Sequence, residues 1–313
     1  MIKTNNLKKD FDGFTALTDV SCTIPKGCIY GMVGSNGAGK STFLRVITGV
    51  YRPDKGSILI DDQPVYENPE VKSKMTYVPD ELYFLQGANM NRMAEFYKTI
   101  YEKFDDERYH FLTNAFELDP KKSLATFSKG MKRQAAIILA LSCRPEYMFF
   151  DETFDGLDPV MRNLVKSLIC KDVIESKVTC IITSHSLREL EDICDQLALL
   201  HKGGLVLESD IDNLKTSQFK IQVAFNYDYT EELFKGIEVH NMKKIGSVTN
   251  MIVKGSREET VKMLEELKPI ILEVLPLTLE EVFTYEMDAL GYNFDDILEW
   301  WGMREDENYE KQN

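Results

Sequence analysis

Short apolar runs alternate with longer stretches of helical periodicity over the first two thirds of the chain. This alternation is typical of an α/β fold with a largely parallel central sheet. The last run is followed by a turn-like His201-Lys202-Gly203-Gly204 and then by Leu205-Val206-Leu207, which predicts a closing hairpin. We therefore expect a first domain over residues 1–213. The runs that predict strands lie at 29–33, 58–61, 76–78, 148–151, 178–183 and 197–200.

Residues 214–285 predict a small α+β domain. Strand-like runs occur at 219–225, 248–253 and 270–274, and helix-like stretches occur at 258–267 and 279–285. We find no catalytic motif in this region. We therefore expect the chemistry of the chain to lie in the first domain.

Residues 286–313 predict an acidic tail. This segment contains nine Asp and Glu residues and only two Lys and Arg residues, which gives a local net charge of −7. Phe294, Ile297, Leu298 and Trp301 recur there at helical spacing behind Asn293, a common helix cap. The acidic face disfavours binding to an anionic membrane surface. The predicted helix would pack on this chain's own C-terminal domain or on a second copy, and both interpretations stand.

Composition excludes several classes of protein. No apolar run approaches the roughly 20 residues that a helix needs to cross a bilayer, and no export signal is present, so we expect a cytoplasmic protein. The net charge of −14 argues against nucleic acid as a partner, because phosphate binding relies on clustered Lys and Arg. The six cysteines lack paired spacing and predict buried, reduced thiols.

The segment from Gly34 to Ser41 matches the phosphate-loop pattern G-x4-G-K-[ST] and lies between a predicted strand and a predicted helix at 42–48. Glycines allow backbone N–H groups to surround phosphates, and the following helix directs its partially positive end toward them. We expect Lys40 to reach the β- and γ-phosphates and Ser41 to hold Mg²⁺. The candidate nucleotide-binding residues here are Gly34, Asn36, Gly37, Gly39, Lys40, Ser41 and Thr42.

A second candidate element is the apolar run Tyr147-Met148-Phe149-Phe150, which ends in Asp151 and Glu152. Carboxylates directly after a buried strand are typical of a strand beside a phosphate loop. We expect Asp151 to hold Mg²⁺ through water, and Glu152 to orient and polarise the attacking water.

The order of motifs resembles the ABC ATPase family. Phe127-Ser128-Lys129-Gly130-Met131 is similar to the family's signature motif, commonly Leu-Ser-Gly-Gly-Gln, and it precedes the acidic pair. Asp155-Gly156-Leu157-Asp158 and then Ser184-His185 follow in the family's order. The resemblance covers residues 1–213 and implies a P-loop NTPase fold, that is, an ABC-type nucleotide-binding domain with a helical subdomain.

The resemblance also implies roles for residues outside the phosphate loop. Ser128 and Gly130 would bind the γ-phosphate of ATP held by an opposite subunit, and Asp158 would link the two sites of a head-to-tail dimer. We expect the second ATPase subunit to be identical, and a heterodimer is the alternative. His185 would contact the γ-phosphate, and Phe11 would stack on adenine. The implied cofactors are ATP and Mg²⁺, and the implied catalytic residues are Glu152, His185 and Lys40.

Two motifs depart from the family pattern. Asp80 stands where the family usually has Gln, so the loop that senses Mg²⁺ and the membrane subunit carries a carboxylate. Asp80 could ligate the metal, or it could face solvent. In the signature, Lys129 and Met131 replace Gly and Gln, while both γ-phosphate-binding positions are retained.

The segment 276–283 resembles the closing segment of ATPases from bacterial exporters of antibiotics, peptides and lipids. The resemblance implies an ATPase that is peripheral on the inner face of the cell membrane and drives a separate permease. We expect the loop 80–84 and a helix over 92–104 to receive that permease. The alternative is a soluble, non-transport ABC ATPase that acts on a macromolecular partner.

Overall fold

A computed structural model describes residues 1–211, 218–227, 229–275 and 277–289. The chain forms two compact units, which divide between Glu208 and Ser209. The boundary predicted at Asn213 and the tail helix predicted after Asn293 lie outside the described residues. Within the described ranges, every helix is too short or too polar to cross a bilayer.

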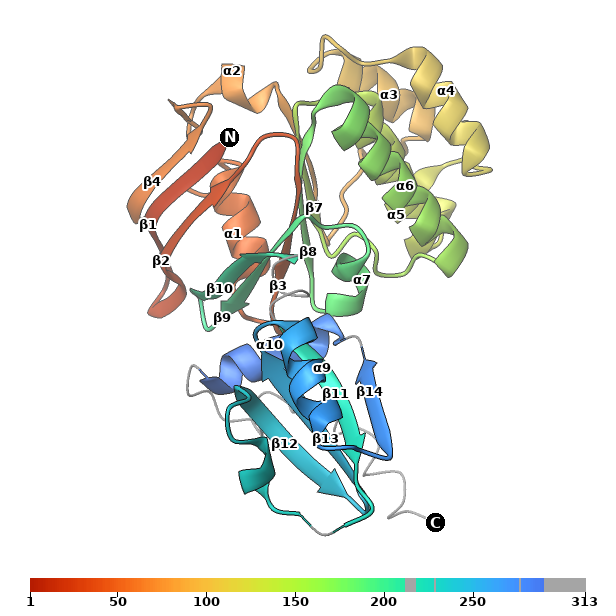
Figure 1. Cartoon of the computed structure of the whole chain (residues 1–313). Coiled ribbons are helices and arrows are strands. Elements are labelled where there is room, and N and C mark those ends of the chain that lie inside the picture. The colour runs from red at the N-terminus through yellow and green to blue at the C-terminus, as the bar shows by residue number, and fades with distance from the viewer. Residues whose placement is uncertain (212–217, 228, 276, 290–313) are drawn as a thin grey trace, which may run out of the picture. The chain divides into compact units, whose positions relative to one another are not determined.

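The first unit is built around a six-stranded sheet (Figure 1). Its order is β10-β9-β3-β8-β7-β6, and the pairs from β9 to β6 are parallel. Strands β3, β7 and β8 are buried along their whole length, as expected when a parallel sheet is covered on both faces. This confirms the predicted fold class. The strands are β3 (Ile29–Val33), β6 (Met75–Val78), β7 (Tyr147–Asp151), β8 (Thr179–Ser184), β9 (Gln196–His201) and β10 (Gly204–Asp210).

A second, antiparallel sheet of the first unit was not predicted. It has the order β2-β1-β4-β5, with β1 (Ile2–Phe11), β2 (Phe14–Ile24), β4 (Lys55–Ile60) and β5 (Gln63–Pro64). The run at 58–61, which we assigned to the central sheet, belongs to β4 and pairs antiparallel with β1. The first strand was missed because its buried positions, such as Ile2 and Leu7, are separated by Lys and Asn, which are uncommon in strands.

Helix α1 (Lys40–Ile47) joins the two sheets through one hydrophobic cluster. The cluster contains Phe43 and Leu44 of α1 together with Leu7 of the antiparallel sheet and Met32 and Phe149 of the central sheet. The phosphate-loop segment runs directly into α1, so this packing fixes the position at which the loop ends. The helix starts two residues before the predicted stretch 42–48.

A group of helices forms the expected helical subdomain beside the central sheet (Figure 1). Helix α5 (Lys129–Ser142) contacts both α3 (Met90–Lys98) and α4 (Asp106–Ala115). The helix predicted over 92–104 ends at Lys98, because Asp105 caps a new helix by accepting a hydrogen bond from the Arg108 N–H. Other helices of this unit are α2 (Pro69–Lys72), α6 (Pro159–Ser176) and α7 (Leu187–Glu191), and the 3₁₀ turn η1 covers Leu124–Thr126.

The second unit has a four-stranded antiparallel sheet with the order β12-β13-β11-β14. Ile221, Val253 and Leu264 lie in its core, so the sheet packs against α9. Strand β12 was missed because it contains few apolar residues. The elements are β11 (Gln218–Ala224), η2 (Glu231–Phe234), β12 (Val239–Ile245), β13 (Val248–Lys254), α9 (Arg257–Glu266), β14 (Ile271–Leu275) and α10 (Leu279–Ala289).

Candidate nucleotide-binding and catalytic site

The phosphate loop turns tightly between β3 and α1. Gly37 and Gly39 have φ values of 81° and 108°, in the left-handed region that favours glycine. A Cβ atom at Gly34 would lie 2.5 Å from the Leu200 carbonyl oxygen, so this position also requires glycine. Gly39 caps α1 without a side-chain hydrogen bond, which leaves the first N–H groups of the helix to an external acceptor. The loop therefore fits an anionic ligand such as a phosphate, with Asn36 exposed and Thr42 half-buried beside it.

Lys40 is buried below the loop, with 5% of its surface exposed. Its Nζ donates to the carbonyl oxygens of Gly34 at 2.5 Å and Ser35 at 3.1 Å, and it pairs with Glu152 Oε1 at 3.0 Å. An ammonium group has three donors, so these three contacts satisfy it. A phosphate that binds Lys40 must therefore replace at least one of these acceptors.

Asp151 ends β7 and is fully buried. Its Oδ1 accepts hydrogen bonds from Ser41 Oγ at 3.0 Å and Thr183 Oγ1 at 2.7 Å. Its Oδ2 accepts from the Tyr77 hydroxyl at 3.3 Å. Burial, and then the nearby Asp151 charge, raise the pKa of Tyr77, so this phenol stays a hydrogen-bond donor. Ser41 and Asp151 thus present hard oxygen atoms side by side, a donor set that suits Mg²⁺.

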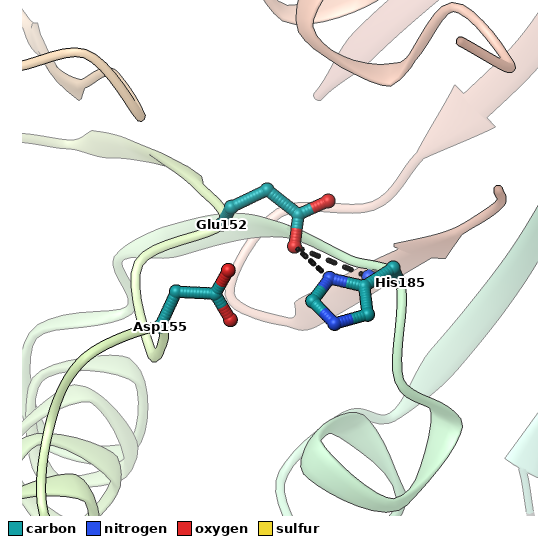
Figure 2. A group of neighbouring side chains, drawn as sticks. All are labelled: Glu152, Asp155 and His185. Carbon is teal, nitrogen blue, oxygen red and sulfur yellow. Dashed lines mark hydrogen bonds and ion pairs between the residues drawn. The ribbon is translucent and has the colours of Figure 1, made fainter. Parts of the chain in front are cut away.

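Glu152 lies between Lys40 and His185. Its Oε2 accepts hydrogen bonds from His185 through the ring Nδ1 at 3.0 Å and the main-chain N–H at 3.2 Å (Figure 2). A carboxylate can only accept, so this contact fits the tautomer in which Nδ1 carries the ring proton and Nε2 is left for another partner. The backbone of Glu152 has a φ of 46°, an unusual left-handed conformation for a residue other than glycine.

Asp155 approaches the same pair. One ligand atom from each of Glu152, Asp155 and His185 lies within 4.8 Å of the others (Figure 2). Glu152 Oε2 already accepts two hydrogen bonds from His185, whereas Oε1 pairs with Lys40 and keeps a further lone pair that can accept a hydrogen from water. The arrangement can therefore hold a water molecule next to a group that takes its proton.

Ser128 and Asp158 each cap a helix. Ser128 Oγ accepts from the Met131 N–H at 3.2 Å at the start of α5, and Asp158 Oδ1 accepts from the Val160 and Met161 N–H groups, both at 3.0 Å, at the start of α6. A Cβ atom at Gly130 would lie 2.7 Å from the Gly156 carbonyl oxygen. The start of α5 therefore packs directly against the loop that follows Glu152.

Comparison with known proteins identifies the family. A model of the ABC transporter family matches residues 17–155. The ABC transporter ATP-binding protein YtrB of Bacillus subtilis is 35% identical over 283 residues, which cover 90% of this chain and 97% of YtrB. The chain belongs to the ABC transporter ATP-binding proteins. It is an ATPase of that family.

Two further comparisons delimit the similarity. The methionine import ATP-binding protein MetN of Protochlamydia amoebophila is 32% identical over 206 residues, which cover 63% of this ABC ATPase and 60% of MetN. A solved dimeric structure of a post-hydrolysis state of the ATP-binding cassette MJ0796, bound to ADP and Pi, aligns with a TM-score of 0.61 at 20% identity. That alignment covers 67% of this chain and 99% of the cassette, and it shows a shared fold.

Phe11 lies at the end of β1, across the hairpin from Phe14. Its ring is 38% exposed, contacts Tyr51 edge-on with the ring centroids 5.3 Å apart, and has Lys9 Nζ 5.1 Å from its centroid. The ring is therefore held in place and still accessible. Its stacking on adenine in this ABC ATPase stays a prediction.

Asp80 has a partner that the sequence did not predict. Its Oδ1 pairs with Arg133 Nη2 at 2.7 Å, whereas Ser41 and Asp151 contact each other. Ligation of Mg²⁺ by Asp80 remains untested. Arg133 was missed, although its position on α5, four residues before Ile137 and seven before Ala140, places it on a buried helical face. Thr183 was also missed, because the sequence carries no local sign of its bond to Asp151.

Proposed function

We propose that two copies of this ABC ATPase close head to tail around two molecules of MgATP and thereby drive a separate membrane permease. The main support for this proposal is the position of Glu152. Its carboxylate contacts both Lys40 and His185, next to the hydrogen-bonded pair of Ser41 and Asp151. In this proposal Lys40 is the phosphate-binding cation, Glu152 is the proton acceptor, and Ser41 with Asp151 forms the metal-binding oxygen pair. Such a set supports hydrolysis of ATP.

Within this proposal each residue has one task. Lys40 exchanges its loop carbonyl partners for phosphate oxygens. Glu152 accepts a proton from the water as the water oxygen bonds to the γ-phosphorus and the bond to the ADP oxygen breaks. Ser41 and Asp151 would hold Mg²⁺, which supplies neutralising positive charge on the phosphates. His185 keeps the carboxylate oriented through Nδ1.

The composite site is supported by the exposure of Ser128. Its capping bond uses an oxygen lone pair, so its O–H remains able to donate to a phosphate of a second copy. Ser128→Asp is a suitable test, because Asp caps helices as well as Ser does while it adds a negative charge opposite the phosphate. Ser256→Asp, at the cap of α9, is the matched control.

The experiment mixes two inactive variants. Ser128→Asp keeps its own phosphate loop, and Lys40→Ala keeps its own signature. A head-to-tail dimer of one copy of each contains one intact site, so the mixture should hydrolyse ATP faster than either variant alone. An activity no greater than the average of the two separate variants would show that each site lies within one chain.

Within the same proposal, the permease exports a peptide, an antibiotic or a lipid, and the ATPase is held at the inner face of the membrane by it. The similarity to YtrB extends over 90% of the chain and includes the second unit, whereas the similarity to the methionine importer covers 63%. Transport into or out of inside-out vesicles, with the co-purified permease, tests the direction. Failure to recover any membrane protein would favour the non-transport alternative.

The proposed receiving surface is the loop after β6 together with α3. Tyr83 is 83% exposed, and Phe96 and Ile100 are also exposed. Changing Tyr83 and Phe84 to Ser should abolish stimulation of the ATPase by the permease and should leave ATP binding unchanged. Phe111→Ser, at an exposed aromatic of α4, is the matched control. Stimulation at the parental level in the double variant would refute this surface.

A further inference from the structure

Arg133 is the least exposed charged side chain of the signature helix α5, with 1% of its surface accessible. Its guanidinium donates to two neighbouring groups of one loop, the Pro79 carbonyl oxygen at 2.9 Å and Asp80 Oδ1 at 2.7 Å. Among the residues that the structure describes, its buried Nε has no hydrogen-bond partner. The hydrogen bonds identified for this guanidinium therefore all come from the loop that follows β6.

A guanidinium keeps its charge at all accessible pH values, so its burial requires an anionic or strongly polar partner. Asp80 supplies the only full negative charge that pairs with Arg133 among the described residues. If Asp80 turned away to ligate a metal ion, the buried Arg133 would keep one carbonyl contact and lose its counter-ion. This favours a stable Asp80–Arg133 pair over metal ligation by Asp80.

The pair also connects two parts of the site. Strand β6 contacts α5 and pairs with β7, which carries Asp151. Arg133 lies five residues after Ser128, about 7.5 Å along the helix axis at 1.5 Å per residue. A helix of 14 residues transmits a displacement at Arg133 to its own start, where Gly130 packs on the loop after Glu152.

We propose that Asp80 is a positioning residue, the counter-ion of Arg133, and that this pair couples the loop after β6 to the signature helix. This inference rests on the proposed two-copy site, in which Ser128 acts on the nucleotide of the second copy. The position of the loop then sets the position of Ser128. Asp80 accordingly acts on closure of the dimer and not on affinity for Mg²⁺.

The test is a double-mutant cycle with Asp80→Asn and Arg133→Met. Asp80→Asn alone should leave Arg133 without a counter-ion, lower the melting temperature and weaken ATP-driven dimerisation of the Glu152→Gln protein about tenfold. In the Arg133→Met background, the same Asp80 change should have little effect, because no buried cation remains. Asp80→Glu should restore most of the loss, since it keeps a carboxylate.

The Mg²⁺ concentration for half-maximal ATPase separates the two roles of Asp80. If Asp80 is a positioning residue, Asp80→Asn should change this Mg²⁺ concentration by no more than about twofold. If Asp80 is a metal ligand, Asp80→Asn should raise the Mg²⁺ concentration about tenfold or more, both with Arg133 and with the Arg133→Met change. Additive effects in the cycle, or that rise in Mg²⁺ requirement, would overturn the inference. If Glu152→Gln with native Asp80 forms no ATP-dependent dimer, the proposed function fails, while the melting and Mg²⁺ measurements still decide the role of Asp80.

Discussion

Replacement of Glu152 by Gln isolates proton acceptance from every other property of that side chain. The amide has nearly the same shape, and its oxygen can still accept a hydrogen bond from Lys40 or from His185. It cannot take a proton from water. The perturbation therefore removes the step that the proposed function assigns to Glu152, while it keeps the shape of the side chain and one of its two acceptor oxygens.

The expected loss follows from the contribution of a positioned general base, about 100- to 10,000-fold in rate. At about 1.36 kcal/mol per factor of ten, this corresponds to about 2.7–5.4 kcal/mol in the activation barrier. ATP binding should survive, because the glycine loop, Lys40 and the Ser41–Asp151 pair are unchanged. Loss of the ion pair with Lys40 should lower the melting temperature without nucleotide. Bound ATP should recover it, by about 2.7 kcal/mol at 100 times the dissociation constant.

Phosphate release measures the rate, and size-exclusion chromatography with ATP alone, Mg-ATP and ADP measures association. We expect almost no release, together with a dimer that forms with ATP and not with ADP. Glu175→Gln, the same change at an exposed position of α6, should behave like the parent. Hydrolysis by Glu152→Gln at the parental rate would refute the role of this carboxylate as the base.

Three further outcomes are expected. Phe11→Ala should weaken ATP binding by about 1–3 kcal/mol in a fluorescence titration, and Phe11→Tyr should spare it; equal affinities in all three proteins would exclude stacking. His185→Ala should slow single-turnover hydrolysis about 100-fold with ATP binding retained, and a fast variant would remove His185 from the site. Burial raises the pKa of the Cys22 thiol to about 11, and Cys170 is the one cysteine that is not buried. A thiol reagent at neutral pH should therefore modify Cys170 first, as mass spectrometry of digested peptides can show, and early labelling of Cys22 would contradict its burial.

The parts of the site that could be predicted from the sequence are local in the chain. The glycines of the phosphate loop, Lys40 and Ser41 are adjacent, and Asp151 and Glu152 follow four apolar residues directly. Local spacing also predicted the strands of the central sheet, because parallel strands buried on both faces appear as continuous apolar runs.

Contacts between residues that are far apart in the chain have no local sequence pattern from which they could be predicted. Arg133 and Asp80 are 53 positions apart, and Thr183 and Asp151 are 32 apart. Neither pair follows a helical or strand period, so only the folded chain brings them together. The antiparallel sheet was missed for a related reason. Its first strand, β1, has half-buried Lys and Asp positions. Its apolar residues can be assigned to a buried face only from its pairing with β2 and β4.

The left-handed backbone at Glu152 has a consequence for any attempt to make this enzyme more heat-resistant. Backbone conformations of this kind cost about 1–3 kcal/mol in residues that have a Cβ atom, and glycine adopts them freely. Glycine or asparagine at position 152 would relieve this strain, but it would also leave the buried Lys40 without its carboxylate partner. Under the proposed function such a variant would not turn over ATP, so a screen for heat resistance must score turnover and survival in the same clone.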